Sequence, residues 1–228
     1  QKLSNYWQPG ESHALNLLDN FMEYKAGQYG DKRDYPSIDI TSQLSASLHH
    51  GEVTPRALVS RALQARAEQD TEQQAASVET FIKQIIWREF AHHILYHYPH
   101  TTDQPMDERF SDDFWRHDDQ ALLDWQRGET GVPIVDAGMR QLWETGWMHN
   151  RVRMIVASYL TKNLGVHWLH GARWFWDTLV DADLANNTMG WQWVAGCGVD
   201  AAPYYRIFNP LTQAQRFDLQ GHYIRRWL

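Results

Sequence analysis

The sequence predicts an all-α fold, and three observations support that class. Apolar residues recur at intervals of three and four along most of the chain, the spacing of one helical face. Proline and glycine stand where these runs stop. No segment alternates apolar and polar residues over enough positions to predict a β-sheet. With 228 residues, 43% of them hydrophobic, we expect one mostly helical domain over residues 1–228.

Helix signals can be read in order through the first half of the chain. The first apolar stripe lies within residues 15–22, and Gly27 is expected as the left-handed residue after that helix. Residues 28–53 are rich in Gly, Asp, Ser and Thr and predict a long connection, interrupted by TSQLSASL. Thr54 then predicts an N-cap, and Pro55 predicts the first helical position.

The remaining elements follow from one long stripe and one helical pair. Pro99 is expected to end the long helix, whose apolar stripe we assign to Ile82, Ile86, Phe90 and Ile94, with Phe81 and Ile85 beside them. Residues 100–132 are polar and irregular and predict a surface connection. After Pro133, two helical runs flank Gly146, which predicts an antiparallel pair joined by a short turn.

Composition and charge exclude several classes of protein. No apolar run approaches the about 18 residues that a membrane span needs, so we expect no membrane partner. The lone Cys197 excludes an internal disulfide framework and favours a reducing, cytoplasmic location. A net charge of −7 argues against nonspecific polyanion binding by the whole surface, although a local basic cleft stays compatible with it. The sequence begins without Met, so we expect a fragment.

Three short motifs leave alternatives open when only residue spacing is considered. His93 and His97 have the i, i+4 spacing of metal ligands, but a third ligand is not evident, so we predict no metal site. The hydroxyls of TSQLS, residues 41–45, suit either a phosphate group at a helix start or an ordinary cap. Arg153 is either a partner for a buried carboxylate such as Asp181 or part of a solvated helix end.

Longer motifs resemble the DNA photolyase/cryptochrome flavoproteins over essentially the whole chain. They are IIWREF, GETGVPIVDAGMRQLWETGWMHNRVRM, DADLANN, GWQW and DAAPYYRIFNPLTQ. The resemblance is closest to class I photolyases, which act on cyclobutane pyrimidine dimers. It corresponds to the C-terminal helical domain that binds FAD. The family's N-terminal α/β antenna domain is expected to be missing from this sequence.

The resemblance implies two sets of residues around FAD. The phosphate and ribose side would be lined by Tyr29, Thr41, Ser42, Gln43, Leu44 and Ser45, with Gln43 where close relatives often have Arg. On the flavin side, Trp147 and Asn150 would lie beside the cofactor, and Asp181 would pair with Arg153. Asp183 would accept a hydrogen bond from flavin N3–H, and Asn187 would face flavin N5. An Asn at this position is typical of photolyases, whereas animal and plant cryptochromes tend to carry Cys or Asp.

The resemblance also implies an electron path and a DNA surface. Trp191, Trp168 and Trp115 match the family's tryptophan triad. A flipped-out lesion would lie between Trp87 and Trp193 and beside Asn150 and Met154. The residues expected near the DNA backbone or lesion are Arg33, Arg88, Arg151, Arg206 and Gln213. Gln84 departs from the Glu usual in dimer photolyases and is expected to weaken stabilisation of the lesion radical.

Taken together, the sequence predicts a light- and FAD-dependent carbon–carbon lyase. It would repair cyclobutane pyrimidine dimers in damaged DNA by electron transfer from photoexcited reduced FAD, and act as a monomer. The histidines that six–four photolyases carry near Asn150 and Met154 are replaced here, which favours the cyclobutane dimer. The alternative is a cryptochrome-like blue-light photoreceptor, and a third possibility is a helical interaction domain that has lost flavin.

Overall fold

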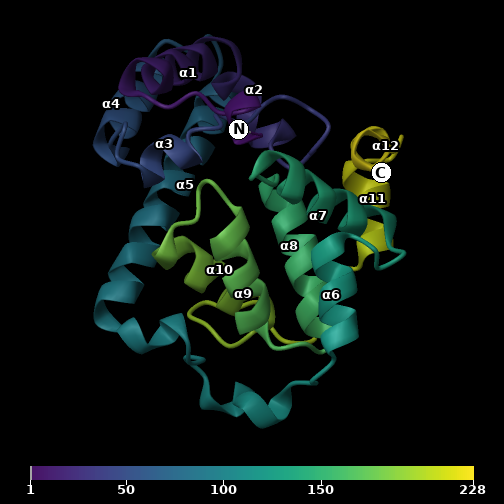
Figure 1. Cartoon of the computed structure of the whole chain (residues 1–228). Coiled ribbons are helices and arrows are strands. Elements are labelled where there is room, and N and C mark those ends of the chain that lie inside the picture. The colour runs from purple at the N-terminus through teal and green to yellow at the C-terminus, as the bar shows by residue number, and fades with distance from the viewer. Residues whose placement is uncertain (1) are drawn as a thin grey trace. The chain divides into compact units, whose positions relative to one another are not determined.

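The computed structural model describes residues 2–228, which form helices joined by irregular segments (Figure 1). Within these residues the β structure is one isolated parallel bridge between Arg116 and Val166, so the predicted all-α class is confirmed. The chain divides into two compact units, the first ending at Phe90 and the second running from Ala91 to Leu228. Over the same residues, no helix is both long and apolar enough to cross a membrane.

The first unit is built around aromatic and aliphatic side chains of α-helices. Its elements are η1 (Leu3–Asn5), α1 (Glu11–Tyr24), α2 (Ala26–Lys32), α3 (Ser45–His49), α4 (Pro55–Ala67) and the start of α5 (Glu72–His97), which continues into the second unit. Phe21 packs against Phe81 at a ring-centroid distance of 4.7 Å and edge-on against Tyr29 at 5.5 Å. The predicted start of α4 is confirmed, because Ala57 N donates to Thr54 Oγ1 and Pro55 opens the helix.

Two helix predictions in this unit are wrong in detail. Helix α1 ends at Tyr24, and Gly27 lies inside α2 instead of ending α1. A Cβ on Gly27 would lie 2.8 Å from Gln69 Oε1, so close packing against the α4–α5 connection explains this glycine. On α5, Ile86 is 59% exposed, whereas Ile85 is buried. Residues four apart rotate steadily around a helix, so the row from Ile82 to Ile86 drifts away from the core, while the neighbouring Phe81 and Ile85 of the same predicted stripe stay buried.

The second unit contains most of the remaining helices. Its elements after α5 are η2 (Pro99–Thr102), η3 (Glu108–Phe110), η4 (Asp112–Phe114), α6 (Asp119–Arg127), α7 (Pro133–Thr145), α8 (Asn150–Ser158), the π-helical turn η5 (Tyr159–Asn163), α9 (Trp168–Thr178), α10 (Leu184–Ala195), α11 (Pro210–Phe217) and α12 (His222–Trp227). The predicted pair around Gly146 is confirmed as α7 and α8, which pack together. Gly146 has φ 69°, the left-handed conformation that glycine adopts readily.

Residues 100–132 are more structured than the sequence predicted. Helix α6 begins at the Asp118 N-cap, whose carboxylate accepts from Ala121 N, and it ends at the left-handed Gly128. Trp115 and Trp125 of this segment are buried in the core of the unit. The prediction of a surface connection is therefore wrong here, because its polar residues are caps and its aromatic residues face inward.

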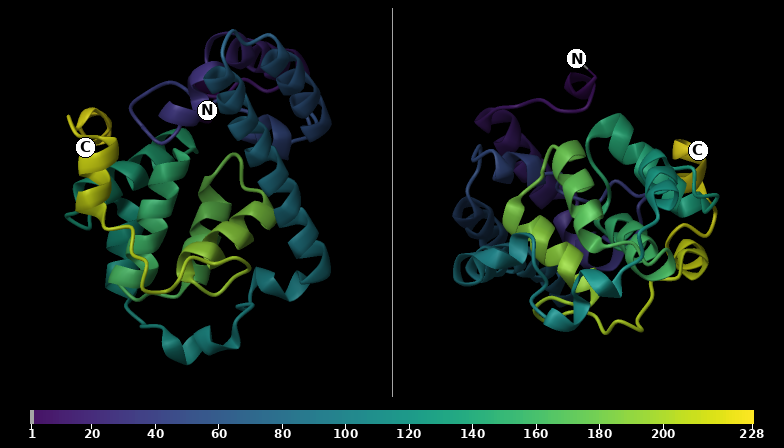
Figure 2. Two further views of the ribbon diagram at one scale, coloured as in Figure 1. Left: turned by 180° about the vertical axis from the view of Figure 1, so that it is seen from behind. Right: turned by 60° about the horizontal axis from the view of Figure 1, so that its bottom comes forward.

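Helices α9 and α10 form the centre of the second unit and lie side by side (Figure 1). Gly171 makes this approach possible, since a Cβ there would lie only 2.1 Å from the Trp191 ring. At the C-terminus, α12 (yellow in Figure 2) packs on α7. Tyr223 Oη donates to Gln141 Oε1 at 2.6 Å in this contact. These contacts fix the helices that carry most of the candidate site.

Candidate functional site

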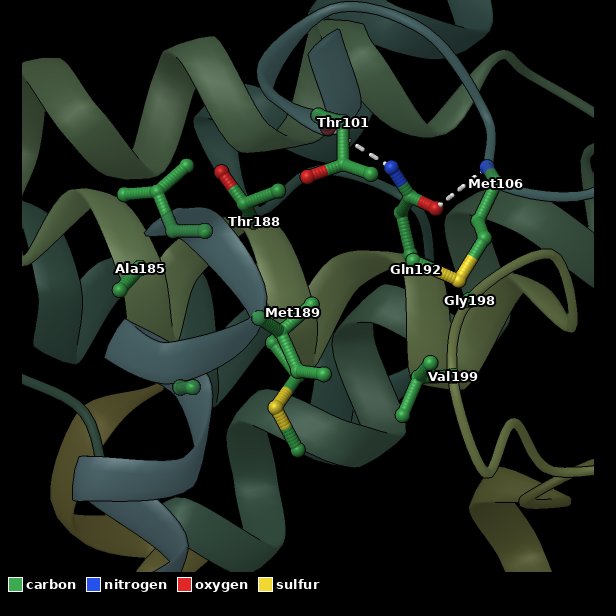
Figure 3. A pocket seen from close by; sticks show the side chains of 11 residues that line it. Thr101, Met106, Ala185, Thr188, Met189, Gln192, Gly198 and Val199 are labelled. Atoms are coloured by element: carbon green, nitrogen blue, oxygen red, sulfur yellow. Dashed lines mark hydrogen bonds between the residues drawn. The ribbon is translucent and has the colours of Figure 1, made fainter. Parts of the chain in front are cut away.

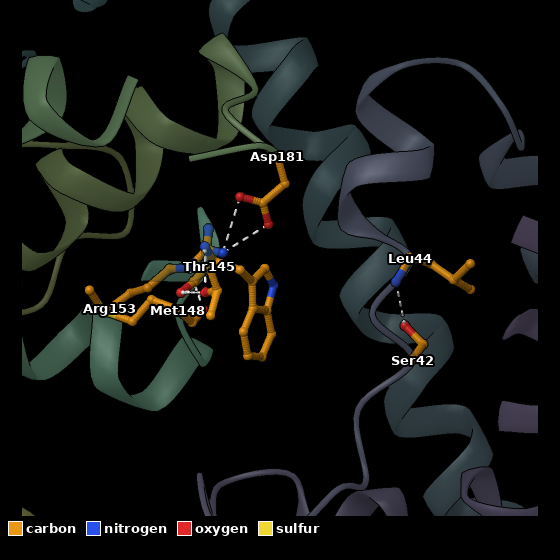
Figure 4. A network of polar contacts seen from close by, with 7 residues as sticks. Ser42, Leu44, Thr145, Met148, Arg153 and Asp181 are labelled. Atoms are coloured by element: carbon orange, nitrogen blue, oxygen red, sulfur yellow. Dashed lines mark hydrogen bonds and ion pairs between the residues drawn. The ribbon is translucent and has the colours of Figure 1, made fainter. Parts of the chain in front are cut away.

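A buried ion pair lies at the centre of the predicted flavin-side residues. Arg153 on α8 places Nη2 2.8 Å from Asp181 Oδ2 and 3.1 Å from Oδ1 (Figure 4). Arg153 Nε also donates to Met148 O at 2.7 Å, which fixes the guanidinium plane. The Asp181 side chain is 3% exposed. The predicted partnership is present, and the alternative of a solvated helix end is wrong.

Asp183, two residues further on, is the N-cap of α10. Its Oδ1 accepts from Asn186 N at 2.9 Å and from Asn186 Nδ2 at 2.6 Å. Its Oδ2 lies 3.2 Å from Nε2 of His92. His92 and Asn186, the two partners of the Asp183 carboxylate, were not predicted from the sequence. The N-cap position of Asp183 could have indicated Asn186, but only the fold brings His92 close.

Asn187 has a fixed amide orientation. Its Nδ2 donates to Ala172 O on α9 at 2.8 Å, across the contact between α9 and α10. The side chain is partly buried. With its amino group committed, the amide presents its oxygen as a hydrogen-bond acceptor. An acceptor oxygen suits the position facing flavin N5 that the resemblance implies for Asn187.

The turn before α8 places the other flavin-side residues. His149 is the N-cap, with Nδ1 accepting from Arg151 N, and Trp147 N donates to Thr145 Oγ1. Asn150, the first residue of α8, is exposed and its Nδ2 lies 3.8 Å from Met154 Sδ. Their i, i+4 spacing on α8 brings these two side chains together.

The three predicted relay tryptophans are all buried in the second unit. Trp191 packs edge-on against Phe175 and Trp125, at ring-centroid distances of 5.0 and 6.0 Å. Trp168, at the start of α9, stacks on His167. Trp115 contacts the same histidine from the segment before α6. His167 was not predicted from the sequence, because it is not one of the three tryptophans that the resemblance implies. Only its ring contacts with Trp168 and Trp115 reveal it.

The first unit carries the predicted phosphate-side residues. Helix α3 begins at Ser45, the last of the three TSQLS hydroxyls, and the Leu44 N-cap has no side-chain acceptor for the first amides. Leu44 N donates weakly to Ser42 Oγ at 3.4 Å (Figure 4). Gln43 has φ 55°, an uncommon conformation for a non-glycine residue. Tyr29 is largely enclosed, and burial raises the pKa of its hydroxyl.

The predicted DNA-side residues of the first unit lie on α2 and α5. Arg33 places its guanidinium 5.5 Å from the Tyr29 ring centroid. Trp87 is 47% exposed and contacts Phe90, while Arg88 pairs with Glu89 at 2.7 Å. Gln84 is half-buried, and its Nε2 donates to Thr80 O at 3.4 Å.

The other DNA-side residues belong to the second unit. The Arg151 guanidinium lies 4.5 Å from the Phe217 ring centroid, and the Arg206 guanidinium lies 5.8 Å from Phe208. Trp193 also contacts Phe208, at a ring-centroid distance of 6.0 Å. Gln213 Oε1 is buried and lacks a hydrogen-bond partner within residues 2–228. Phe208 thus connects one predicted lesion wall to one predicted backbone contact.

Two further features of the second unit do not indicate a ligand site. The rings of His93 and His97 pack 4.4 Å apart, and the described residues hold no cluster of three metal-ligating side chains. A small pocket next to α10 has a largely apolar lining (Figure 3). Its main polar group, Gln192, already bonds the backbone of Thr101, Gln104 and Met106. This pocket therefore belongs to the packing of the 101–106 segment.

The residues of each unit fit their predicted parts of FAD. In the first unit, a helix start without a side-chain cap follows a run of hydroxyls, which suits phosphate oxygens. In the second unit, Arg153 compensates the charge of Asp181, and Asn187 holds its oxygen as an acceptor. This donor and acceptor set matches the needs of a flavin edge.

Known proteins with similar sequences and structures agree with this geometry. The family model described as "FAD binding domain of DNA photolyase" matches residues 81–228. The deoxyribodipyrimidine photo-lyase of Agrobacterium fabrum is 47% identical over 227 residues, covering 99% of this chain and 46% of that protein. The Escherichia coli protein of the same name is 45% identical over 219 residues, covering 96% and 46%.

Two solved structures extend the comparison. A bacterial class III photolyase from Agrobacterium tumefaciens has a TM-score of 0.91 at 46% identity, covering 99% of this chain and 46% of that one. A cryptochrome from Synechocystis has a TM-score of 0.89 at 33% identity, covering 97% and 46%. The chain thus spans about half the length of the curated relatives it matches. The predicted fold and the predicted cofactor, FAD, are confirmed.

Proposed function

Because this chain belongs to the family of the FAD-binding domain of DNA photolyase, we propose that it is the flavin- and lesion-binding part of a light-driven DNA-repair lyase. The observation that carries the proposal is the arrangement along Asp181 to Trp191. One carboxylate is neutralised by Arg153, one caps α10, and the Asn187 amide is fixed with its oxygen as an acceptor. Trp191 follows one helical turn later.

Side chains of the second unit set the charge and the hydrogen-bonding groups that a bound flavin would meet. When bound, FAD supplies the absorption of light and the exchange of single electrons. Arg153 offsets the charge of Asp181, so that this buried carboxylate does not oppose a reduced, negatively charged flavin. Asn187 offers an acceptor to a proton at flavin N5 and cannot remove that proton as a base would. These residues therefore favour the reduced state of the cofactor that repair requires.

We propose cyclobutane pyrimidine dimers in DNA as the substrate. As the resemblance implies, Trp87 and Trp193 each present an aromatic ring on which a damaged pyrimidine turned out of the helix would stack. Arg151 and Arg206 provide positive charge for phosphates, and an acidic chain needs such local charge to bind DNA. The curated relatives named deoxyribodipyrimidine photo-lyase support this substrate class.

The cryptochrome-like photoreceptor is the less supported alternative. The Synechocystis cryptochrome is 33% identical to this chain, whereas the photo-lyases of Agrobacterium fabrum and Escherichia coli are 47% and 45% identical. Asn187, Asn150 and Met154 also favour repair, as the sequence resemblance implies.

We further propose that the protein acts as a monomer in the cytoplasm. Burial raises the pKa of the lone Cys197 thiol to about 12, so this thiol is unsuited to pairing with a second copy.

The proposal is tested with purified protein reconstituted with FAD and chemically reduced. An oligonucleotide that carries one cyclobutane dimer is added, and the dimer content is compared after blue light and after the same time in darkness. We expect loss of the dimer only in the light, and tighter binding of the damaged oligonucleotide than of its undamaged counterpart. Flavin binding and photoreduction with equal affinity for both oligonucleotides would instead support the photoreceptor.

A further inference from the structure

One histidine contacts two of the three relay tryptophans. The His167 ring lies 5.6 Å from the Trp168 ring with an interplanar angle of 29°, a stacked arrangement. It lies 5.4 Å from the Trp115 ring with an angle of 57°. His167 is 8% exposed, so solvent is largely excluded from this contact. The imidazole therefore joins two indoles that come from separate segments of the second unit.

Hydrogen bonding fixes the tautomer of this imidazole. Leu169 N donates to Nδ1 at 3.0 Å, so Nδ1 carries no proton and acts as the cap of α9. Nε2 lies 3.2 Å from Asp112 Oδ1 and donates its proton to that carboxylate. The neutral ring with its proton on Nε2 satisfies both contacts, and the same two bonds hold the ring plane against Trp168.

Burial and nearby charged groups shift the pKa of His167. Desolvation lowers the pKa of the imidazole, and His170 and Arg173 on α9 lower it further. Asp112 on η4 acts in the opposite direction. The net direction is downward from 6.5, so the ring stays neutral at neutral pH. A neutral ring places no positive charge against the indoles.

The Trp168 indole also lacks a route for losing a proton. Its Nε1 is buried and has no hydrogen-bond partner in residues 2–228. Trp115 Nε1, by contrast, donates to Phe110 O at 3.1 Å. Oxidised Trp168 therefore keeps its proton and its positive charge until an electron reaches it from another ring.

We propose that His167 is a positioning residue of the electron path, whose neutral ring couples Trp115 to Trp168. This inference rests on the proposed function. The step moves one electron from Trp115 to oxidised Trp168, so that Trp168 returns to the neutral indole and Trp115 becomes the radical cation. The oxidant at the start is a photoexcited oxidised flavin, and an added thiol reduces Trp115 at the end. A positive charge on His167 would destabilise a radical cation on either indole, and so would hinder the arrival of positive charge at this pair of tryptophans.

Two substitutions separate this role from helix capping. His167→Asn keeps a side-chain oxygen that can cap α9, but it removes the ring. His167→Phe keeps an aromatic ring and removes the cap. If His167 couples the indoles, the Asn variant is the slower one in flavin photoreduction. If it only caps the helix, the Phe variant is the more impaired.

The first experiment measures the rate of photoreduction of bound, oxidised flavin in blue light with a thiol present. We expect His167→Asn to be slowed by about tenfold, the scale on which a misplaced group acts, with His167→Phe close to wild type. Wild type should also slow by about tenfold as His167 is protonated below pH 6.5, while the Phe variant should not. Equal rates for Asn and Phe, or the reverse order, would overturn the inference.

A second readout needs no flavin. In the flavin-free chain, the NMR titration of His167 should coincide with a pH-dependent change in indole fluorescence, because a protonated imidazole quenches a stacked indole. Trp168→Phe should remove most of that change. Wild-type protein that binds no FAD would overturn the proposed function, whereas normal photoreduction with no effect of either His167 variant would overturn only the present inference.

Discussion

Arg153 and Asp181 form a charge pair in which the carboxylate is almost fully buried and the guanidinium is partly buried. The Asp181 and Arg153 side chains are 3% and 25% exposed, and Arg153 has a third bond to Met148 O. Removing one partner of such a pair leaves a charge that the surroundings cannot solvate. The pair therefore makes the second unit sensitive to either substitution.

We expect Asp181→Asn to lower the free energy of unfolding by about 3 kcal/mol, the lower end for breaking a buried pair, because Arg153 retains some solvent. Urea denaturation measures the change. The control is Glu79→Gln, which breaks the exposed pairs with Lys83 and Arg66 and should cost about 1 kcal/mol or less. Equal losses in the two variants would contradict the buried pair as a stabilising contact.

Gly171 and Gly190 should respond to alanine in opposite ways. A Cβ on Gly171 would overlap the Trp191 ring, so Gly171→Ala should destabilise the chain by about 1–3 kcal/mol or more. Gly190 lies inside α10, where an added Cβ would meet no heavy atom within 4 Å, so Gly190→Ala should stabilise it by about 0.5–1 kcal/mol. Thermal unfolding of both variants checks the signs, and a stabilised Gly171→Ala protein would contradict the close contact.

Gln192 should hold the 101–106 segment against α10. Its Nε2 donates to Thr101 O and Gln104 O, and its Oε1 accepts from Met106 N (Figure 3). Gln192→Leu leaves these backbone groups unsatisfied, and each buried one costs about 1–3 kcal/mol. Hydrogen exchange should therefore become faster at Met106. The matched control, Gln120→Leu, breaks only an exposed bond to Asp124 and should leave Met106 protected.

The sequence predicted local signals well and tertiary relationships poorly. Thr54 and Pro55 mark a helix start through chemistry that acts within one turn, so the structure agrees. Gly27 looked like a helix end because nothing near it in sequence indicates Gln69, the side chain whose amide oxygen a Cβ on Gly27 would meet. His167 shows the same limit, since its partner Trp115 lies far away in the sequence and only the fold brings the rings together.

Lys162 should make stability depend on pH in the alkaline range. On the π-helical turn η5 it donates to the carbonyls of Pro203 and Arg206, at 3.3 and 2.7 Å. Desolvation, followed by the charge of Arg206, lowers the pKa of Lys162 from 10.5 to about 8. Between those values the unfolded chain binds more protons than the folded chain, so stability rises with pH.

The measurement compares wild type with Lys162→Met by denaturant unfolding at several pH values from 7 to about 10.5. The stability difference should shift in favour of wild type as the pH rises, with a slope below about 1.4 kcal/mol per pH unit because solvent screens this half-exposed group. Lys83→Met controls for the loss of an exposed lysine. A difference that stays flat over the range would contradict the lowered pKa.

Gln84→Glu tests the one substrate-side position where the chain departs from its resemblance to dimer photolyases. Gln84 is half-buried on α5, and its bond to Thr80 O is long at 3.4 Å, so the side chain is free to turn toward a substrate. A carboxylic acid at this position can donate a proton that an amide cannot donate as an acid. We expect the yield of dimer repair per absorbed photon to rise by a factor of about 2–10, a small part of what a positioned general acid contributes.

Repair yield and DNA affinity must be measured separately, because a new carboxylate also repels phosphate. Gln84→Met is the matched control, since it keeps the length of the side chain and removes its hydrogen bonds. Its repair yield should fall below that of wild type, which places the three side chains in the order Glu, Gln, Met. If Glu and Met gave the same yield at saturating damaged DNA, the side chain at this position would not touch the lesion. The radical would then have to be stabilised by other residues of the chain.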